Sequence, residues 1–272
     1  MTSRAEQSLG YVILGVFSLL ALAPIVGILF TSLQDPNGIA SFGALNGLHF
    51  ENFKTAWVEG NFGAYLKSSI IVSVSVVVVA TLFSIMAGYA FGLMRFRGST
   101  VLFYVFLLGL MVPTEAIIVP LYYDLRDLNL TNTYWALILP QIATSVAFGT
   151  YWMRTYFRTV PRSLIEAARL DGASSWFTLW RVLLPLARPA VLTMTVLLFM
   201  WTWNEFLLAL VMVTDEELRT APLGLSFFQG RNTSDLSLMA AASVIVALPV
   251  VILYVFLQRH FIRGMLAGAV KG

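Results

Sequence analysis

Long apolar segments are the feature of this 272-residue sequence that most limits how it can fold. A helix of roughly 20 mostly apolar residues crosses a hydrocarbon core of about 30 Å. Six segments meet this requirement, at about residues 9–33, 66–94, 101–122, 134–153, 189–213 and 238–258. Their apolar residues are continuous rather than alternating, which favours helices over the strands of a membrane barrel. The sequence therefore predicts an all-α membrane protein with six transmembrane helices.

Composition agrees with this class and excludes several others. Hydrophobic residues make up 58% of the chain and charged residues 11%, whereas soluble domains are about 45–50% apolar and about 25% charged. The chain has no cysteine, which excludes disulfides, thiolate zinc sites and cysteine nucleophiles. The two histidines, His49 and His260, lie far apart, so we expect no metal site. The first apolar segment is too long for a signal peptide and is kept as a span.

Charge is distributed unevenly between the predicted loops, and this sets the orientation. Twelve of the 17 Lys and Arg residues fall on one side, namely Arg4, Arg95, Arg97, Arg154, Arg158, Arg162, Arg169, Arg181, Arg188, Arg259, Arg263 and Lys271. Nine acids fall in the opposite loops, namely Asp35, Glu51, Glu59, Asp124, Asp127, Asp215, Glu216, Glu217 and Asp235. Positively charged loops stay in the cytoplasm. We therefore expect both termini and the loop at residues 154–188 to be cytoplasmic.

That loop, between the fourth and fifth spans, is long enough to carry a function. Connections longer than about 12–15 residues are usually functional or disordered, and this one is rich in helix formers. Ser163 and Glu166 have the spacing of a capping box, which predicts a helix start. Gly172 fits the left-handed position that ends such a helix.

A second short helix follows in the same loop. Ser174 or Ser175 can cap it, and Pro185 is expected to end it after Leu184. The loop is thus predicted to form two helices at the cytoplasmic surface. From the pattern alone, they either pack on lipid headgroups or dock another protein.

The sequence of this loop from Glu166 to Pro185 is EAARLDGASSWFTLWRVLLP. It resembles the EAA loop of ATP-binding-cassette importer permeases, in which E-A-A is followed by three residues, Gly, nine residues, Ile, one residue and Leu-Pro. The matching residues are Glu166, Ala167, Ala168, Gly172, Leu184 and Pro185, with Val182 in place of Ile. The resemblance extends from the second span to the end of the chain.

Further motifs resemble those of the maltose-type, carbohydrate-importing subgroup of these permeases. They are Asn132-Thr133-Tyr134-Trp135, Trp203-Asn204-Glu205-Phe206 and the tail Gly268-Ala269-Val270-Lys271-Gly272. The resemblance implies a single permease domain over residues 1–272 in a bacterial-type inner membrane. It also implies that the tail contacts the ATPase dimer and that a set of loop residues couples the chain to an ATPase. These residues are Ser163, Glu166, Ala167, Ala168, Asp171, Gly172, Leu184 and Pro185.

The same resemblance implies a set of partners. They are a second permease subunit, forming a heterodimer, two ATP-binding-cassette ATPase subunits and an extracytoplasmic sugar-binding protein, all around the lipid bilayer and without nucleic acid. None of Lys54, Lys67 or Lys271 follows a glycine, so the chain has no P-loop. We therefore expect no catalytic residue and no cofactor in this chain, with ATP and Mg bound by the partner ATPases.

Polar residues inside the predicted spans are candidates for the substrate path. Glu115 and Glu205 lie where an ionised side chain is costly, so each should face a cavity or the helix bundle. The two acids either line a sugar path, act as proton sites, or satisfy architectural needs. Trp203 and Asn204 are further candidates for the path. Pro113, Pro120 and Pro140 are expected to break or kink the third and fourth spans.

Three functional interpretations remain open. The resemblance favours a permease for an oligosaccharide or another neutral sugar, and importers of glycerol-3-phosphate or a polyol are the nearest alternative. A proton-coupled carrier would depend on Glu115 and Glu205. A membrane scaffold that binds an ATPase without moving solute is the third interpretation.

Overall fold

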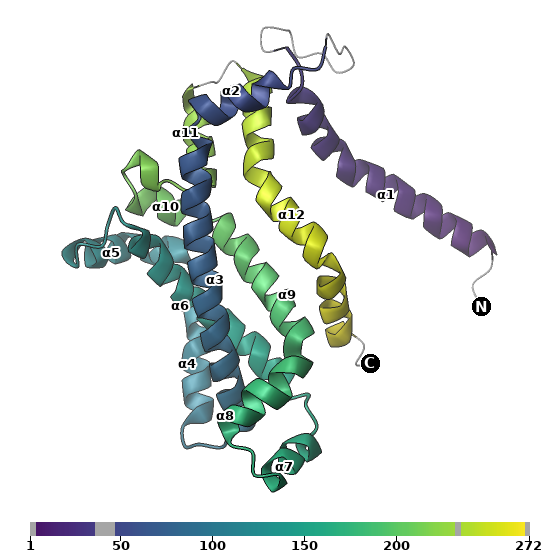
Figure 1. Cartoon of the computed structure of the whole chain (residues 1–272), viewed down its shortest axis with the longest axis vertical. Helices are drawn as coiled ribbons and strands as arrows, with labels where there is room; N and C mark the ends of the chain where they lie inside the picture. The colour runs from purple at the N-terminus through teal and green to yellow at the C-terminus, as the bar shows by residue number, and fades with distance from the viewer. Residues whose placement is uncertain (1–3, 36–46, 232–234, 270–272) are drawn as a thin grey trace. The chain divides into compact units, whose positions relative to one another are not determined.

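The protein is described here from a computed structural model, which covers residues 4–35, 47–231 and 235–269 (Figure 1). Side chains are described for residues 6–35, 47–230 and 235–258. Every regular element within these ranges is helical, which confirms the all-α prediction. In chain order they are α1 (Arg4–Thr31), α2 (Glu51–Glu59), α3 (Phe62–Leu93), α4 (Ser99–Met111), α5 (Thr114–Asp127), α6 (Tyr134–Phe157), α7 (Arg162–Leu170), α8 (Ser175–Phe177), η1 (Thr178–Leu183), α9 (Leu184–Trp203), α10 (Leu207–Met212), η2 (Glu216–Leu218), α11 (Ala221–Arg231) and α12 (Leu236–Ala269).

The chain divides into two compact units. One consists of Met1–Gly63 and Gly224–Leu248, and the other of Ala64–Leu223 and Pro249–Gly272. In the first unit, the buried side chain of Asn52 joins the end of α1 to α2. Its Nδ2 donates to the carbonyl oxygens of Ser32, at 3.0 Å, and Gln34, at 2.8 Å. Buried polar groups are hydrogen-bonded in this way because an unpaired amide would be costly.

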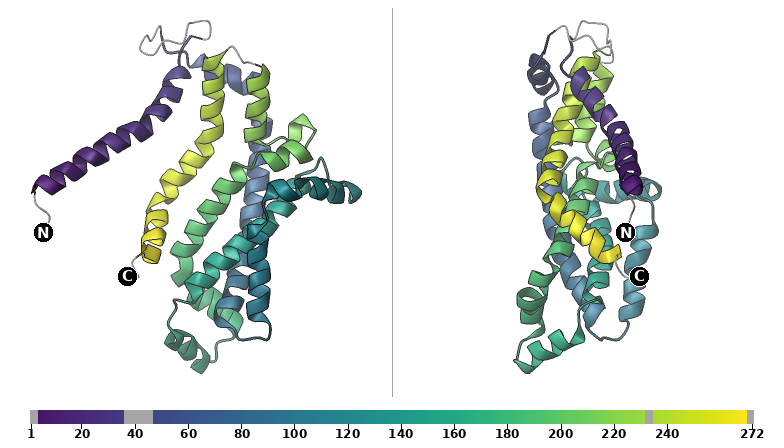
Figure 2. Two further views of the ribbon diagram at one scale, coloured as in Figure 1. Left: turned by 180° about the vertical axis from the view of Figure 1, so that it is seen from behind. Right: turned by 90° about the vertical axis from the view of Figure 1, so that its right-hand side faces the viewer.

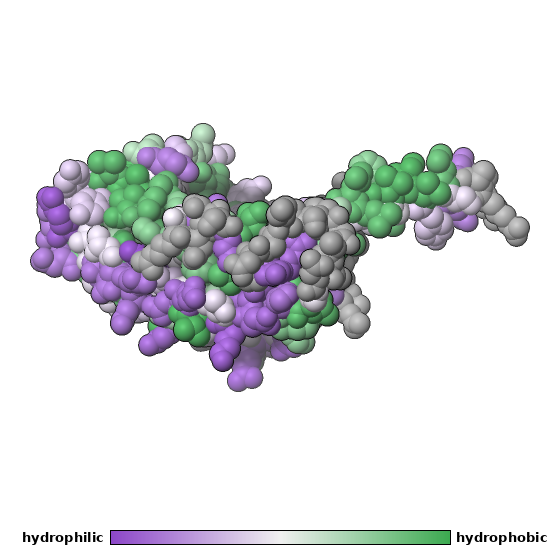
Figure 3. Space-filling model, turned by 90° about the horizontal axis from the view of Figure 1, so that it is seen from above, coloured by the Kyte–Doolittle hydropathy of each residue, from purple (hydrophilic) through white to green (hydrophobic). Residues whose placement is uncertain are grey.

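Helix α1 carries its apolar residues without protein cover. In its most apolar window, from within Glu6–Thr31, no residue is buried. Figure 3 shows largely hydrophobic side chains on the face of α1 that is turned to the viewer. A helix that is apolar on all sides belongs in hydrocarbon or in a protein interior. The surface of α1 is therefore suited to a membrane.

The predicted spans are reproduced in part. Among the described residues, the helices long and apolar enough to cross a membrane are Glu6–Thr31, Phe62–Leu93, Ser175–Trp203 and Leu236–Gln258, and the bent pair α4 and α5 adds a fifth if it is one span. Helix α6, predicted as a span over residues 134–153, has 24 residues and is about 36 Å long at 1.5 Å per residue. It is less apolar because polar residues lie along it. The six-span topology and its orientation thus stay predictions.

Two predicted spans are interrupted. The third bends by 96° between α4 and α5, where Val112 and Pro113 have extended backbone angles. The left view of Figure 2 shows α5 turning away from α4. The expected break at Pro113 is confirmed, whereas α5 continues through Pro120 and α6 through Pro140. The fifth predicted span, 189–213, is wrong as a continuous helix, because α9 ends at Trp203 and α10 begins at Leu207.

The core of the second unit depends on a close crossing of α3 and α6. A Cβ added to Gly88 would lie 2.4 Å from the Met153 Cβ and 2.9 Å from the Arg154 backbone nitrogen. A Cβ on Gly149 would lie within 3 Å of the Ser84 side chain. Small residues let helix backbones approach closely, as they do in membrane helix pairs. Glycine at these positions is thus required by the distance between the two helices.

Two apolar clusters extend this core in opposite directions along the helices. One is centred on Val72 and Val76 of α3 and packs against α6 and α10. The other includes Met153 and Phe157 at the end of α6, which pack against Leu179 and Leu183 of η1. The second cluster therefore supports the long loop between α6 and α9.

The tight crossing generates a stability prediction for Gly88→Ala. The new methyl group would overlap Met153, so α3 and α6 must separate, at an expected cost of about 1–3 kcal/mol. Gly15→Ala in α1 is the matched control, because a Cβ there meets no atom within 4 Å. Thermal unfolding of the purified protein in detergent measures both. An unchanged melting temperature for Gly88→Ala would contradict the close packing.

Candidate functional site

Helix α7, which carries the E-A-A residues, does not begin as the sequence predicts. Its N-cap is Pro161, with extended backbone angles (φ −59°, ψ 133°) and no side-chain cap. Ser163 already lies inside the helix, so the predicted capping box between Ser163 and Glu166 is wrong. The reason is that the extended backbone ends at Pro161, whose fixed φ suits the residue at which the helix starts. The first helical residue is therefore Arg162, one residue before the predicted cap.

The end of α7 is built as the sequence predicts. Gly172 has φ +77°, in the left-handed region that favours glycine. The N–H of Gly172 donates to the Arg169 carbonyl at 3.0 Å, and the N–H of Ala173 to the Ala168 carbonyl at 2.9 Å. This pair of bonds is a Schellman motif, which satisfies the last carbonyls and reverses the chain. Gly172 thus fixes the angle at which the chain leaves α7.

The second helix starts at a predicted cap but continues past its predicted end. The Ser174 hydroxyl accepts from the Phe177 N–H at 3.2 Å, so Ser174 is the cap. The predicted end at Pro185 is wrong, because α8, η1 and α9 form one helix from Ser175 to Trp203. The N–H of Leu184 donates to the Leu179 carbonyl, five residues back, in the wider π-turn of η1. This widened turn immediately precedes Pro185 and accommodates its ring and missing N–H.

The loop is fixed to the helices that it joins. Leu179 and Leu183 are buried against the end of α6. The Trp152 indole N–H donates to the Ala190 carbonyl at 3.0 Å, and the Tyr156 hydroxyl to the Leu186 carbonyl at 2.8 Å. These contacts connect the loop directly to α6 and α9.

Helix α7 presents one face to its own unit and the other to solvent. Ala168 is buried and Leu164 packs on the apolar cluster beneath. Glu166, Ala167 and Asp171 are exposed, and Leu170 keeps 90% of its surface accessible. Residues four apart lie on the same face of a helix, so Glu166 neighbours Leu170 and Ala167 neighbours Asp171.

A recess of about 430 Å³ lies at the turn after α7. The residues around it are Ala168, Asp171, Gly172, Ala173, Ser174, Phe177 and Val182. Most of them belong to the predicted coupling segment or to the turn that follows it. The structure thus gathers Ala168, Asp171 and Gly172, while Leu184 and Pro185 lie farther along the same continuous helix and Ser163 is exposed on the first turn of α7.

The candidate path residues of α9 are placed in different environments. Trp203 is only 1% exposed and stacks on Phe199, with ring centroids 5.5 Å apart. Asn204 is exposed, and its Nδ2 donates to the Met200 carbonyl at 2.7 Å, which satisfies the end of α9. Trp203 is therefore a core residue in this conformation.

The two candidate acids, Glu115 in α5 and Glu205 between α9 and α10, have different surroundings. Glu205 is half-buried, and its Oε1 accepts from the Leu208 N–H at 2.8 Å, so it caps α10. Glu115 is exposed in the first turn of α5, immediately after the break at Pro113. An acid at a helix N-terminus is stabilised by the helix dipole. The geometry of Glu205 favours the architectural interpretation over a proton site.

Comparison with known proteins identifies the family. Residues 80–267 match the family described as binding-protein-dependent transport system inner membrane component. The chain belongs to this family. The match includes α7, the glycine turn and all of α9, so the loop lies within the part that defines these permeases.

Individual relatives cover nearly all of this permease. A probable ABC transporter permease protein of Bacillus subtilis is 35% identical over 93% of this chain and 85% of its own length. The diacetylchitobiose uptake system permease protein of Streptomyces coelicolor is 30% identical over 99% of this chain and 91% of its own. One chain of a solved bacterial ABC transporter, involved in the import of the acidic polysaccharide alginate, superposes on this chain with a TM-score of 0.81 and is 27% identical. The superposition covers 96% of this chain and 99% of the other.

One residue that positions the permease fold was not singled out by itself in the sequence. Asn132 has φ +57°, and its N–H donates to the Met212 carbonyl at 2.8 Å. Its Oδ1 accepts from the backbone N–H groups of Thr214 and Asp215, at 3.1 and 2.8 Å. It thereby ties the start of α6 to the end of α10. Asparagine in a turn is a sequence signal for such a left-handed position.

The remaining candidates lie at the C-terminus. Gly268 and Ala269 are the last described residues of α12, while Val270, Lys271 and Gly272 are outside the described residues. Among the residues that the structure describes, no group of three His, Asp or Glu side chains could hold a metal ion.

The two serines of the loop provide a test of the observed caps. Ser174→Ala removes the cap of α8 and should destabilise that turn by about 0.5–2 kcal/mol, whereas Ser163→Ala should have little effect because Ser163 caps nothing. Amide hydrogen exchange measures both, and we expect faster exchange at Phe177 only in Ser174→Ala. Faster exchange across α7 in Ser163→Ala would show that Ser163 caps the helix after all, as the capping-box prediction says.

Two substitutions distinguish the hydrogen-bond acceptor of Glu205 from its charge. Glu205→Gln keeps an oxygen that can accept from the Leu208 N–H, whereas Glu205→Ala removes it. We expect uptake close to the unchanged protein for Glu205→Gln and a loss for Glu205→Ala, together with a stability loss of about 1 kcal/mol. If Glu205→Gln abolished uptake while the protein stayed folded, ionisation of Glu205 would be essential and the architectural role insufficient.

Proposed function

We propose that this chain is the permease subunit of an ATP-driven sugar importer and supplies half of its translocation pathway. The chain has no P-loop, so it is proposed as a non-catalytic subunit acting as one transmembrane permease domain over residues 1–272. The observation that carries the proposal is the α7 loop, which is exposed on one side and fixed to α6 and α9 on the other. That arrangement suits an element that receives force from a partner.

The exposed face of α7 is the proposed contact with the ATPase. Small Ala167 permits close approach of a partner surface, Leu170 offers apolar area, and Glu166 and Asp171 offer charge. Ala168 and Gly172 would set the shape beneath this face, and Ser163 lies at its edge. Leu184 and Pro185, farther along the helix that follows, are proposed to take part in the coupling from there. Closure of the ATPase dimer would then move α7 as a rigid body, and the contacts of Tyr156 and Leu183 would pass the motion to the spans.

The proposed assembly supplies the ATP-binding site that this chain, which has no P-loop, does not carry. A second permease subunit would complete the pathway, and two ATP-binding-cassette subunits would bind ATP and Mg. An extracytoplasmic sugar-binding protein would deliver the substrate. The solved alginate importer in complex with a substrate-bound periplasmic protein, at 14% identity and a TM-score of 0.69, has the same fold.

The orientation and the tail belong to the same proposal. The positive-inside rule places both termini and the α6–α9 loop in the cytoplasm, where an ATPase could reach α7. The tail, Gly268 to Gly272, is proposed to enter the interface of the ATPase dimer, because its small residues would fit a narrow space. Localisation would be the inner membrane of a bacterial-type cell.

The substrate is proposed to be an oligosaccharide or another neutral sugar. The relatives include a permease named for diacetylchitobiose uptake. A phosphate-bearing substrate such as glycerol-3-phosphate would need cations within the path, whereas most of the described arginines lie in loops or near helix ends, apart from Arg181 and Arg188 in the first half of the helix Ser175–Trp203. Glu115 and Asn204 are exposed and remain candidates for the path, and Glu205 is proposed to shape it by capping α10.

Gly172 provides the test of coupling. Gly172→Val places a β-branched side chain at φ +77°, which strains the backbone although no atom lies within 4 Å of the new Cβ. We expect ATP-dependent sugar uptake by the reconstituted complex to fall at least tenfold, because about 1–2 kcal/mol of strain would displace α7.

The matched control is Gly172→Asn, since asparagine tolerates the left-handed region. It should keep most of the uptake, and both variants should still assemble with the ATPase. Normal uptake by an assembled Gly172→Val complex would refute the coupling role. Uptake that persists without ATP but stops when the proton gradient is removed would instead indicate a secondary carrier.

A further inference from the structure

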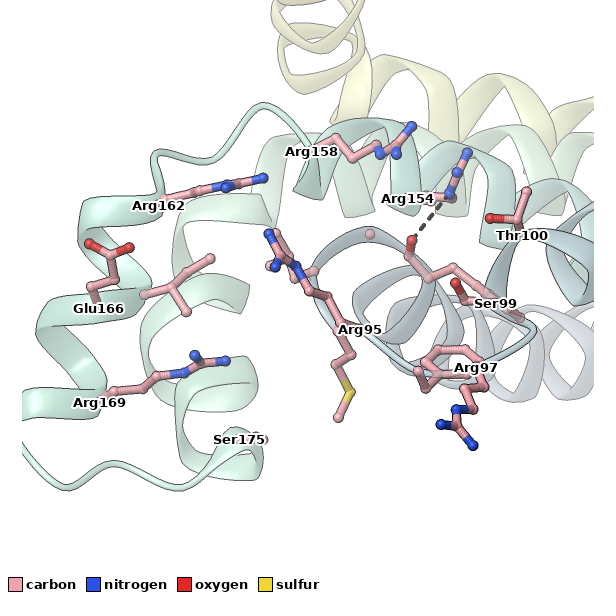
Figure 4. A pocket seen from close by; sticks show the side chains of 16 residues that line it. Arg95, Arg97, Ser99, Thr100, Arg154, Arg158, Arg162, Glu166, Arg169 and Ser175 are labelled. Carbon is pink, nitrogen blue, oxygen red and sulfur yellow. Dashed lines mark hydrogen bonds between the residues drawn. The ribbon is translucent and has the colours of Figure 1, made fainter.

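An arginine-rich cavity of about 940 Å³ lies beside α7, and Glu166 of the proposed coupling face is among the residues that line it. Its walls come from the turn between α3 and α4, the end of α6, and α7. Six arginines line it, namely Arg95, Arg97, Arg154, Arg158, Arg162 and Arg169. Figure 4 shows Arg162 and Arg169 extending from α7 into the space that Arg95 enters from the other side.

Among the described residues, acids do not balance the charge in this cavity. Glu166 is the one acid among the lining residues, against six arginines. Within the described part of the chain, the ion pairs are His49 with Glu51 and Arg126 with Asp127, so none involves these arginines. Like charges held together in one space repel one another, and a bound anion would relieve that repulsion.

One of the six arginines is fixed in place by contacts with the chain. The Arg154 Nε donates to the Phe91 carbonyl at 3.3 Å, and its guanidinium lies 3.7 Å from the centre of the Phe103 ring. This fixes a cation at the inner end of the cavity while the α7 arginines remain exposed at the other. A positioned guanidinium loses less entropy when it binds an oxyanion.

The same cavity has an apolar wall and lies at the ends of apolar helices. Phe91, Leu93, Met94, Phe96 and Ile165 line it beside the arginines. The turn at 94–98 joins α3, a candidate span, to α4, half of the bent candidate span. If both helices cross the membrane as predicted, the turn between them lies at the level of the lipid headgroups. The cavity would then offer cations and apolar surface together where both parts of a lipid are available.

We propose that this cavity binds the phosphate headgroup of an anionic phospholipid. Guanidinium groups match the geometry of phosphate oxygens and bind them through paired hydrogen bonds. The apolar wall would accommodate the start of the acyl chains, which a soluble phosphate or an acidic protein surface does not have. The bound phosphate would join α7 to the α3–α4 turn, and so restrain the helix on which coupling depends.

The experiment compares lipids on the intact full-length chain. Native mass spectrometry in detergent would measure binding of phosphatidylglycerol, with phosphatidylcholine and inorganic phosphate as the other probes. The test variant is Arg95→Gln with Arg158→Gln, which leaves α7 unchanged, so a failure here is distinguishable from a failure of coupling. The control is Arg181→Gln with Arg188→Gln, two exposed arginines that do not line the cavity.

We expect phosphatidylglycerol to bind in preference to phosphatidylcholine, and the test variant to lose on the order of tenfold or more in affinity, since each surface cation contributes separately. The control should bind as the unchanged protein does. Arg95→Lys with Arg158→Lys keeps the charge and should recover part of the affinity, which separates recognition from misfolding.

Other outcomes would overturn the proposal. They are equal binding of phosphatidylcholine, equal losses in the test and control variants, or displacement of phosphatidylglycerol by inorganic phosphate, which would indicate a site for a soluble anion. Loss of bound phosphatidylglycerol when the ATPase subunits assemble would also overturn it, because the cavity would then be part of a protein interface.

Discussion

The close contact between α3 and α6 is the constraint on which the second unit depends. Gly88 and Gly149 remove the side chains that would hold the backbones apart, and Met153 and Phe157 then fill the space toward η1. In a membrane there is no gain from moving apolar surface out of lipid, so packing of this kind supplies much of the association between helices. The α7 loop inherits its position from this contact, because its buried leucines rest on the same end of α6.

Sequence reasoning predicted those features that depend on local chemistry. The apolar segments predicted helices, Pro113 predicted a break, Gly172 predicted a left-handed turn, and Ser174 was one of two predicted caps. Each of these follows from the residue itself and its nearest neighbours. The spacing of the E-A-A segment predicted the family as well, because that spacing is a property of the chain rather than of its packing.

The features that were missed depend on tertiary structure. Ser163 has the right spacing for a cap, but Pro161 already starts the helix. Pro185 normally ends a helix, yet the π-turn of η1 accommodates it, and that turn is held by Leu179 and Leu183 against α6. The arginine cavity joins residues 91–100 with residues 154–175, and only the crossing of the helices brings these segments together.

The continuous helix from Ser175 to Trp203 changes direction without a break. Its 29 residues follow a path of about 43 Å at 1.5 Å per residue, with the turn after α7 at one end and the Asn204 break at the other. Figure 1 shows α8 and α9 running in different directions, and the π-turn of η1 and Pro185 lie between them. Sharp bends in helices arise at such turns and prolines. The part of this helix next to α7 and the part that reaches Asn204 are therefore one hydrogen-bonded element with two axes.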